Sequence, residues 1–105
     1  MPLVRTGLLA IPDADKQEKA ISAFTTFKEK ALKNGAPYIL SSKAAKCTVV
    51  NDKPGSAPWT VVYMISFASQ EDIDYMTKED PVFKEIREKA SVVEATGYIS
   101  VVADI

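Results

Sequence analysis

Hydrophobic and polar positions alternate along the chain in blocks, and these blocks predict the secondary structure. Runs rich in aliphatic, β-branched or aromatic residues predict strands at 3–11, 59–67 and 98–105. A further extended segment covers 37–51, with its main strand at 43–51. Between the second and third of these four strands, Pro and Gly residues in 52–58 predict a turn.

Two longer stretches show helical spacing instead. In 13–35, apolar residues recur at three- and four-residue steps, which places them on one face of a helix. Asp13 or Asp15 can cap its start, and Asn34-Gly35 can end it in left-handed backbone.

The second helical stretch, 69–89, is predicted in two pieces. Ser69 can cap the first piece. Asp80 and Pro81 break the helix and start another, because proline is tolerated in a first turn but not in a helix interior.

The resulting β-α-β-β-α-β order predicts one α+β domain over 1–105 with a ferredoxin-like fold, in which two helices cover one face of a four-stranded antiparallel sheet. The strands carry more apolar residues than one face needs. An exposed apolar sheet face of that size is unusual in a monomer. We therefore expect a C2 homodimer in which two sheets pair into a closed or nearly closed α/β barrel.

Composition and charge exclude several classes of function. The 13 basic and 14 acidic residues are spread along the chain with a net charge of −1, which does not favour nucleic-acid binding. No segment is long and apolar enough to cross a membrane, and the single Cys47 does not indicate an oxidising compartment, so we expect a cytoplasmic protein. Because the chain has no histidine and one cysteine, we expect no metal site and no Ser-His-Asp triad, and no sequence motif calls for a cofactor.

Three local patterns then resemble the stress-responsive A/B barrel family of dimeric α/β-barrel proteins. They are LVRTGLLAI at the N-terminus, the strand-to-helix junction WTVVYMISFASQEDIDY, and the helix start in DIDYMTKEDPVFKEI. The resemblance covers nearly the whole chain and implies the same ferredoxin-like dimer. It also implies a stress-related role or, by similarity to a plant polyketide cyclase of the family, acid–base chemistry without metal or cofactor in an apolar cavity.

The resemblance points to individual residues of this chain. Tyr75 matches the family's tyrosine and is the candidate acid. Phe83 and Arg5 stand where many members have histidine, so the usual proton carriers are absent and the cavity is expected to be smaller and drier. Arg5 could hold an anionic group or enolate in an otherwise apolar strand; alternatively, it snorkels to solvent from the strand's start.

Further aromatic residues are candidates for contact with a ligand. With Phe83, these are Tyr38, Trp59 and Tyr63. The alternative for each, and for Tyr75, is ordinary packing in the core or at an interface.

Three hypotheses of function follow, and the sequence leaves open whether the protein is an enzyme. The first is a dimeric, stress-related or small-hydrophobic-ligand-binding protein with little or no catalysis. The second is a cofactor-free cyclase or lyase for an aromatic or polyketide-like substrate, with Tyr75 and Arg5 as catalytic residues. The third, protein or glycan recognition by the loop at 51–58, has no positive support in the sequence.

Overall fold

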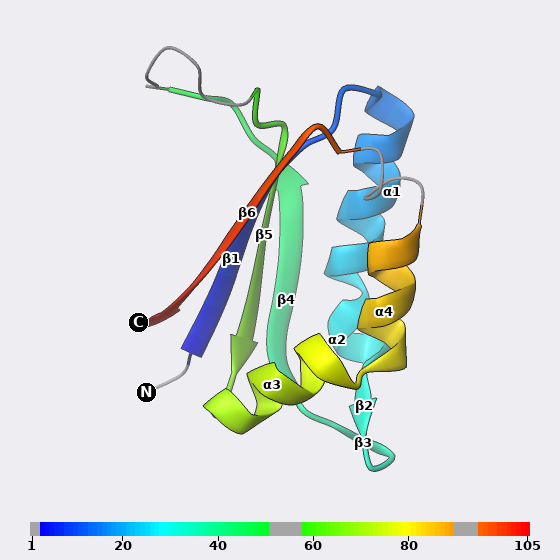
Figure 1. Cartoon of the computed structure of the whole chain (residues 1–105), viewed down its shortest axis with the longest axis vertical. Coiled ribbons are helices and arrows are strands. Elements are labelled where there is room, and N and C mark those ends of the chain that lie inside the picture. The colour runs from blue at the N-terminus through cyan, green and yellow to red at the C-terminus, as the bar shows by residue number, and fades with distance from the viewer. Residues whose placement is uncertain (1–2, 51–57, 90–94) are drawn as a thin grey trace.

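A computed structural model describes residues 3–50, 58–89 and 95–105. Its main sheet has four strands in the order β4-β5-β1-β6, and every neighbouring pair is antiparallel (Figure 1). The strands are β1 (Leu3–Ala10), β4 (Ile39–Lys46), β5 (Val61–Phe67) and β6 (Gly97–Asp104). This is the predicted ferredoxin-like topology.

All helices lie on one side of this sheet (Figure 1). They are α1 (Ala14–Thr25), α2 (Phe27–Lys30), α3 (Gln70–Lys78) and α4 (Pro81–Glu88). The predicted caps are confirmed at three starts, where the side chains of Asp13, Ser69 and Asp80 accept hydrogen bonds from backbone N–H groups of the first turn. The helix therefore breaks at Asp80-Pro81 and a new helix starts there, as the sequence predicted.

Two predicted boundaries were wrong. The first helix does not continue to 35: it breaks at Thr26 and ends after Lys30. Asn34 and Gly35 do adopt left-handed backbone, with φ of 54° and 79°, but they form the turn between β2 (Leu32–Lys33) and β3 (Ala36–Pro37). A hairpin turn and a helix end need the same backbone, so the residue pair alone could not distinguish them.

The second error concerns the strand expected at 43–51. It runs instead over Ile39–Lys46, because this segment pairs with β5 and buries Ile39 under the helices. The turn predicted at 52–58 and the loop at 51–58 lie outside the described residues, except for Pro58.

The strand register separates the two faces of the sheet. Gly7 pairs with Tyr63 and Leu9 with Val61 on the helix side, and Arg5 faces the same way. This side carries the hydrophobic core together with the helices, and its largest fully buried side chains include Tyr63, Phe27, Phe67, Leu9, Ile11 and Ile65.

Within the described residues, no helix lies over the opposite face of the sheet (Figure 1). The register places Leu8, Val62, Ile99 and Val101 there. Ile99 and Val101 on β6 are 48% and 56% exposed. The strands therefore carry apolar residues on both faces, as the sequence pattern indicated.

Candidate functional site

A cavity of about 400 Å³ lies between the helix side of the sheet and helices α1 and α4. Its volume falls within the range of small-molecule sites. Most of its wall is apolar, and the polar groups in it are the hydroxyls of Tyr63 and Tyr98 and the guanidinium of Arg87. The lining residues are Leu9, Phe24, Tyr63, Phe83, Ile86, Arg87, Ala95 and Tyr98.

The back wall of the cavity depends on a glycine in β1. The ring of Tyr63 stacks on Phe24 with a centroid distance of 4.2 Å and an interplanar angle of 4°. A Cβ atom on Gly7 would stand 2.0 Å from Cε2 of Tyr63, so any larger residue would displace this ring. Gly7 thus marks a close approach across two paired strands.

Arg5 lies against the cavity as a buried cation. Its residue is only 7% exposed, so the alternative that it snorkels to solvent was wrong. Nη1 donates to Oγ1 of Thr77 at 3.2 Å and Nη2 donates to the hydroxyl of Tyr98 at 3.3 Å. The guanidinium also lies 5.1 Å from the ring centre of Phe83.

This cation lacks the usual compensation. Within the described residues, no carboxylate forms an ion pair with Arg5, and its buried Nε has no hydrogen-bond partner. Arg87 adds a second positive charge, 5.2 Å from the same Phe83 ring. Burying a charge is unfavourable unless it is paired, so the arrangement favours an anion beside Arg5.

Tyr98 is a phenol whose pKa is lowered beside these charges. Burial by itself raises the pKa of Tyr98, but the hydrogen bonds with Ser100 and Arg5 and the charges of Arg5 and Arg87 outweigh it, so the pKa is lowered from its ordinary value. Its side chain is still largely exposed, at 59%, and forms the rim of the cavity. Burial raises the pKa of Tyr63, and the charge of Arg5 offsets only part of that rise.

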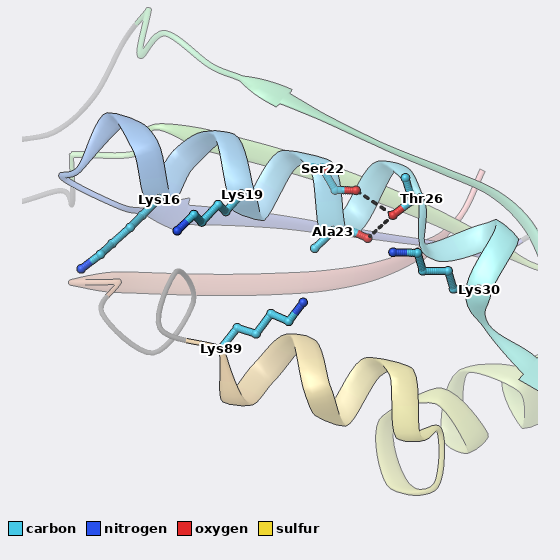
Figure 2. A pocket seen from close by; sticks show the side chains of 7 residues that line it. All are labelled: Lys16, Lys19, Ser22, Ala23, Thr26, Lys30 and Lys89. Carbon is cyan, nitrogen blue, oxygen red and sulfur yellow. Dashed lines mark hydrogen bonds between the residues drawn. The ribbon is translucent and has the colours of Figure 1, made fainter.

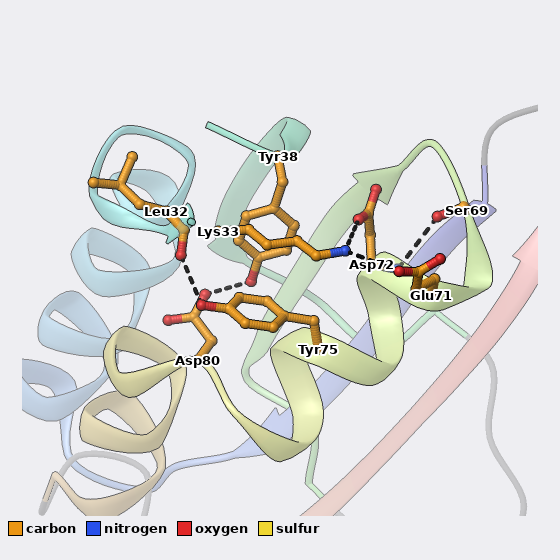
Figure 3. A network of polar contacts seen from close by, with 8 residues as sticks. All are labelled: Leu32, Lys33, Tyr38, Ser69, Glu71, Asp72, Tyr75 and Asp80. Atoms are coloured by element: carbon orange, nitrogen blue, oxygen red, sulfur yellow. Dashed lines mark hydrogen bonds and ion pairs between the residues drawn. The ribbon is translucent and has the colours of Figure 1, made fainter. Parts of the chain in front are cut away.

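A second polar cluster lies where the β2–β3 hairpin meets α3 and α4 (Figure 3). The hydroxyl of Tyr38 donates to Oδ2 of Asp80, a carboxylate that is 2% exposed and also caps α4. The hydroxyl of Tyr75 donates to the carbonyl oxygen of Leu32 at 3.0 Å, and the two tyrosine rings meet edge to face at 5.1 Å.

Lys33 completes this cluster from the hairpin. Its Nζ lies 3.1 Å from Oδ1 of Asp72 and 3.6 Å from Oε1 of Glu71, both in the first turn of α3, and 5.6 Å from the ring centre of Tyr75 (Figure 3). The hydrogen bond to Asp72 is the main reason that the pKa of Lys33 is raised. The cluster fastens the hairpin to the helices.

The structure therefore places the residues proposed from the sequence in three different parts of the molecule. Tyr63 and Phe83 line the cavity, and Arg5 contacts its wall. Tyr38 and Tyr75 belong to the second cluster, and Trp59 lines a hollow with Leu8 and Val62, which belong to the other face of the sheet. Tyr75 and Arg5 share no hydrogen bond or ring contact in the described part of the chain, and a catalytic role for Tyr75 stays a prediction.

Sequence reasoning missed Tyr98 and Arg87. Tyr98 could have been found from strand alternation, because the antiparallel pairing of β1 with β6 puts Tyr98, Ser100 and Val102 on the side of Arg5. Nothing in the sequence singles out Arg87, one of several charged residues in α4.

Over 3–50, 58–89 and 95–105, no group of three His, Cys, Asp or Glu side chains could hold a metal ion. None of the helices in those ranges is long and apolar enough to span a membrane.

Comparison with known proteins places these features on a known fold. No family model matches the chain. It is 28% identical over 97 residues to the "Fusaristatin A biosynthesis cluster protein" of Gibberella zeae, an alignment that covers 92% of this chain and 68% of that protein. It is similar to the hydroxynitrile lyase from Passiflora edulis, with a TM-score of 0.74 and 14% identity over 99% of this chain and 93% of that one.

Two further solved structures are described by their fold. A dimeric ferredoxin-like protein of unknown function from Jannaschia sp. CCS1 matches with a TM-score of 0.73 and 10% identity over 100% of both chains. A DABB family protein with a ferredoxin-like fold from Mesorhizobium loti matches with a TM-score of 0.66 and 11% identity over 99% of this chain and 96% of that one. The chain thus has the ferredoxin-like fold that its resemblance to the A/B barrel proteins implied, and that prediction is confirmed.

Proposed function

We propose that this protein is a dimeric α/β-barrel protein that binds a small, largely apolar ligand bearing an anionic group, with little or no catalysis. The main support is the buried guanidinium of Arg5, whose hydrogen-bond partners are neutral hydroxyls. Its Nε has no hydrogen-bond partner, and no carboxylate among the described residues forms an ion pair with it. A stress-related role remains part of the proposal as the family resemblance implies it.

The physical case starts from the charge. A carboxylate, phenolate or enolate beside Arg5 would gain charge-assisted hydrogen bonds that the Thr77 and Tyr98 hydroxyls do not supply. Aromatic walls formed by Phe24, Tyr63 and Phe83 then favour a flat, apolar body for the rest of the ligand.

Paired aromatic probes test this proposal. Naphthoate carries a carboxylate, and naphthamide has a similar shape without the charge. We expect calorimetric titration to show that the protein prefers naphthoate by about ten-fold or more, because hydrogen bonds to charged groups are the stronger ones. Arg5→Met should abolish this preference, whereas Lys84→Gln, which removes an exposed charge elsewhere, should preserve it. Equal affinity for the two probes, or a preference unaffected by Arg5→Met, would contradict the proposal.

Dimerisation is part of the same proposal. Support comes from the exposed Ile99 and Val101 on the face of the sheet without helices, and from solved structures of this fold that are described as dimeric. Light scattering should give twice the mass of one chain. Val101→Glu should give the mass of a single chain, whereas Val102→Glu, the same change on the opposite face of β6, should leave the dimer intact. A wild-type protein with the mass of one chain would reject the barrel dimer.

The second candidate function is a cofactor-free lyase or cyclase. The observation that favours it is the lowered pKa of Tyr98 next to Arg5. A phenolate there could remove a proton from the substrate, while Arg5 stabilises the negative charge that develops. Tyr75, the acid expected from the sequence, remains the competing candidate.

One solved neighbour supplies a practical assay for this alternative. Because that neighbour is a hydroxynitrile lyase, release of benzaldehyde from mandelonitrile can be measured for wild type, Tyr98→Phe and Tyr75→Phe. Loss of activity only in Tyr98→Phe would support the cavity as the site, and loss only in Tyr75→Phe would support the sequence prediction. No release above the buffer rate would reject lyase activity on this substrate.

A further inference from the structure

A second concave site lies on the outer side of the helices, away from the sheet. It is a groove of about 410 Å³ between the α1–α2 segment and the end of α4 (Figure 2). Four lysines line it, Lys16, Lys19, Lys30 and Lys89, together with the hydroxyl-bearing residues Ser22 and Thr26. Among the described residues, no Asp or Glu lines it.

Helix geometry explains why these charges gather. Lys16, Lys19, Thr26 and Lys30 follow one another at three-, seven- and four-residue steps, which keeps them on one face of the α1–α2 segment. Lys89 comes from the C-cap of α4, far away in sequence. Figure 2 shows the side chains of Lys30 and Lys89 reaching toward each other across the groove.

Carboxylates close by compensate only part of this charge. Lys89 has an ion pair with Glu85 at 3.4 Å, while Glu18 of α1 pairs with Lys46 on the sheet. Lys19 and Lys30 form no ion pair with any described residue. The unpaired charges of Lys19 and Lys30 keep the groove positive, so it is electrostatically suited to an anion with more than one charge.

We propose that this groove binds a polyphosphate group, such as a diphosphate or triphosphate. Lysine ammonium groups bind phosphate as flexible point charges and do not need the fixed planar geometry of a carboxylate–arginine pair. The volume would hold about a dozen water molecules, enough for several linked phosphate groups. Ser22 adds a hydroxyl group that could donate to a phosphate oxygen, whereas the hydroxyl of Thr26 already donates to the carbonyl oxygen of Ser22 at 2.8 Å.

This site is separate from the proposed ligand cavity. The cavity lies on the inner side of α1 and α4, whereas the groove opens on their outer side and includes neither Arg5 nor Tyr98. Polyphosphate binding can therefore hold whether or not the cavity proposal is correct.

Calorimetric titration with inorganic tripolyphosphate at low ionic strength tests the proposal. We expect binding by the wild type, and a loss of about ten-fold or more in the double variant Lys30→Gln/Lys89→Gln, because two converging charges are removed. The matched control Lys28→Gln/Lys84→Gln removes one exposed lysine each from α2 and α4 outside the groove, with the same change in net charge. It should lose about two-fold or less.

Two results would overturn the proposal. One is an absence of binding to the wild type, and the other is an equal loss in both double variants, which would mean attraction to net charge alone. Glutamine preserves helix propensity, and an unchanged or higher Tm for Lys30→Gln/Lys89→Gln would show that lost binding does not come from unfolding. Arg5→Met, which alters the cavity, should bind tripolyphosphate as the wild type does.

Discussion

Two tyrosines, Tyr38 and Tyr98, have charged neighbours of opposite sign, and their pKa values shift in opposite directions. Tyr38 donates its hydroxyl to the buried carboxylate of Asp80, and burial together with this bond raises its pKa strongly. Tyr98 accepts from the guanidinium of Arg5, and its pKa is lowered. In the Tyr38–Asp80 pair, which we call the structural pair, Tyr38 keeps its proton and links its segment to the start of α4. In the Arg5–Tyr98 pair, which we call the reactive pair, Tyr98 can release its proton beside the cavity. Residue type alone therefore does not identify the reactive phenol.

The largest effect should come from breaking the structural pair at its carboxylate. Asp80→Ala removes the cap of α4, where Oδ1 accepts from the backbone N–H groups of Val82 and Phe83, and leaves the Tyr38 hydroxyl without its partner. We expect a loss of about 2–4 kcal/mol in the free energy of unfolding, measured by urea denaturation. Asp80→Asn retains the capping oxygen and should lose clearly less; equal losses would show that the cap is unimportant.

Removing the two hydroxyls compares the pairs directly. Tyr38→Phe leaves a buried carboxylate oxygen without its donor and should cost about 1–2 kcal/mol in unfolding free energy. Tyr98→Phe should change it by about 0.5 kcal/mol or less, because Tyr98 lies largely exposed at the rim. Parallel thermal and urea unfolding of both variants measures the difference. A larger loss in Tyr98→Phe would reverse our assignment of the structural pair.

Removing the cation should change the reactive pair without unfolding the protein. Arg5→Met replaces a buried, uncompensated charge by an apolar side chain of similar length, so stability should stay within about 1 kcal/mol or increase. The pKa of Tyr98 should rise, since burial remains while the charge and hydrogen bond of Arg5 disappear; the hydrogen bond with Ser100 and the charge of Arg87 still lower it. Arg87→Met is the matched control and should move that pKa less, because Arg87 is the weaker influence. Ultraviolet titration of tyrosinate gives the readout, and an unchanged pKa in Arg5→Met would contradict the pairing.

The smallest effect is a difference in the pH dependence of stability. The pKa of Tyr98 is lowered from 10.0, so the folded state favours its phenolate; this stabilisation is complete above pH 10.0 and is lost as the pH falls through the folded-state pKa. The pKa of Tyr38 is raised from 10.0, so its stabilisation is complete below pH 10.0 and is lost as the pH rises toward the folded-state pKa.

Unfolding at a series of alkaline pH values should separate these two contributions. Tyr98→Phe should remove a rise in stability that lies below pH 10.0, and Tyr38→Phe should remove a decline that lies above it. Identical pH profiles for the two variants would show that the opposite charges do not act as described.

The sequence was sufficient to predict the fold, because strand and helix signals depend on residues close together in the chain. Runs of β-branched, aliphatic and aromatic residues predicted β5 and β6. Ser69 and Asp80 marked two helix starts, because each accepts hydrogen bonds within the first turn. It was insufficient for the helix end near Thr26, because Asn34-Gly35 serves a hairpin that pairs residues on both sides of the turn.

For the candidate sites, the sequence by itself determined that Arg5 stands in an apolar strand and that no histidine is available. Only the tertiary structure decided that Arg5 is buried beside Tyr98, that Tyr38 and Tyr75 belong to a different cluster, and that Lys89 joins the lysines of α1 and α2. The physical reason is that caps and periodicity act over a few residues, whereas charge pairing depends on which distant strands and helices the fold brings into contact.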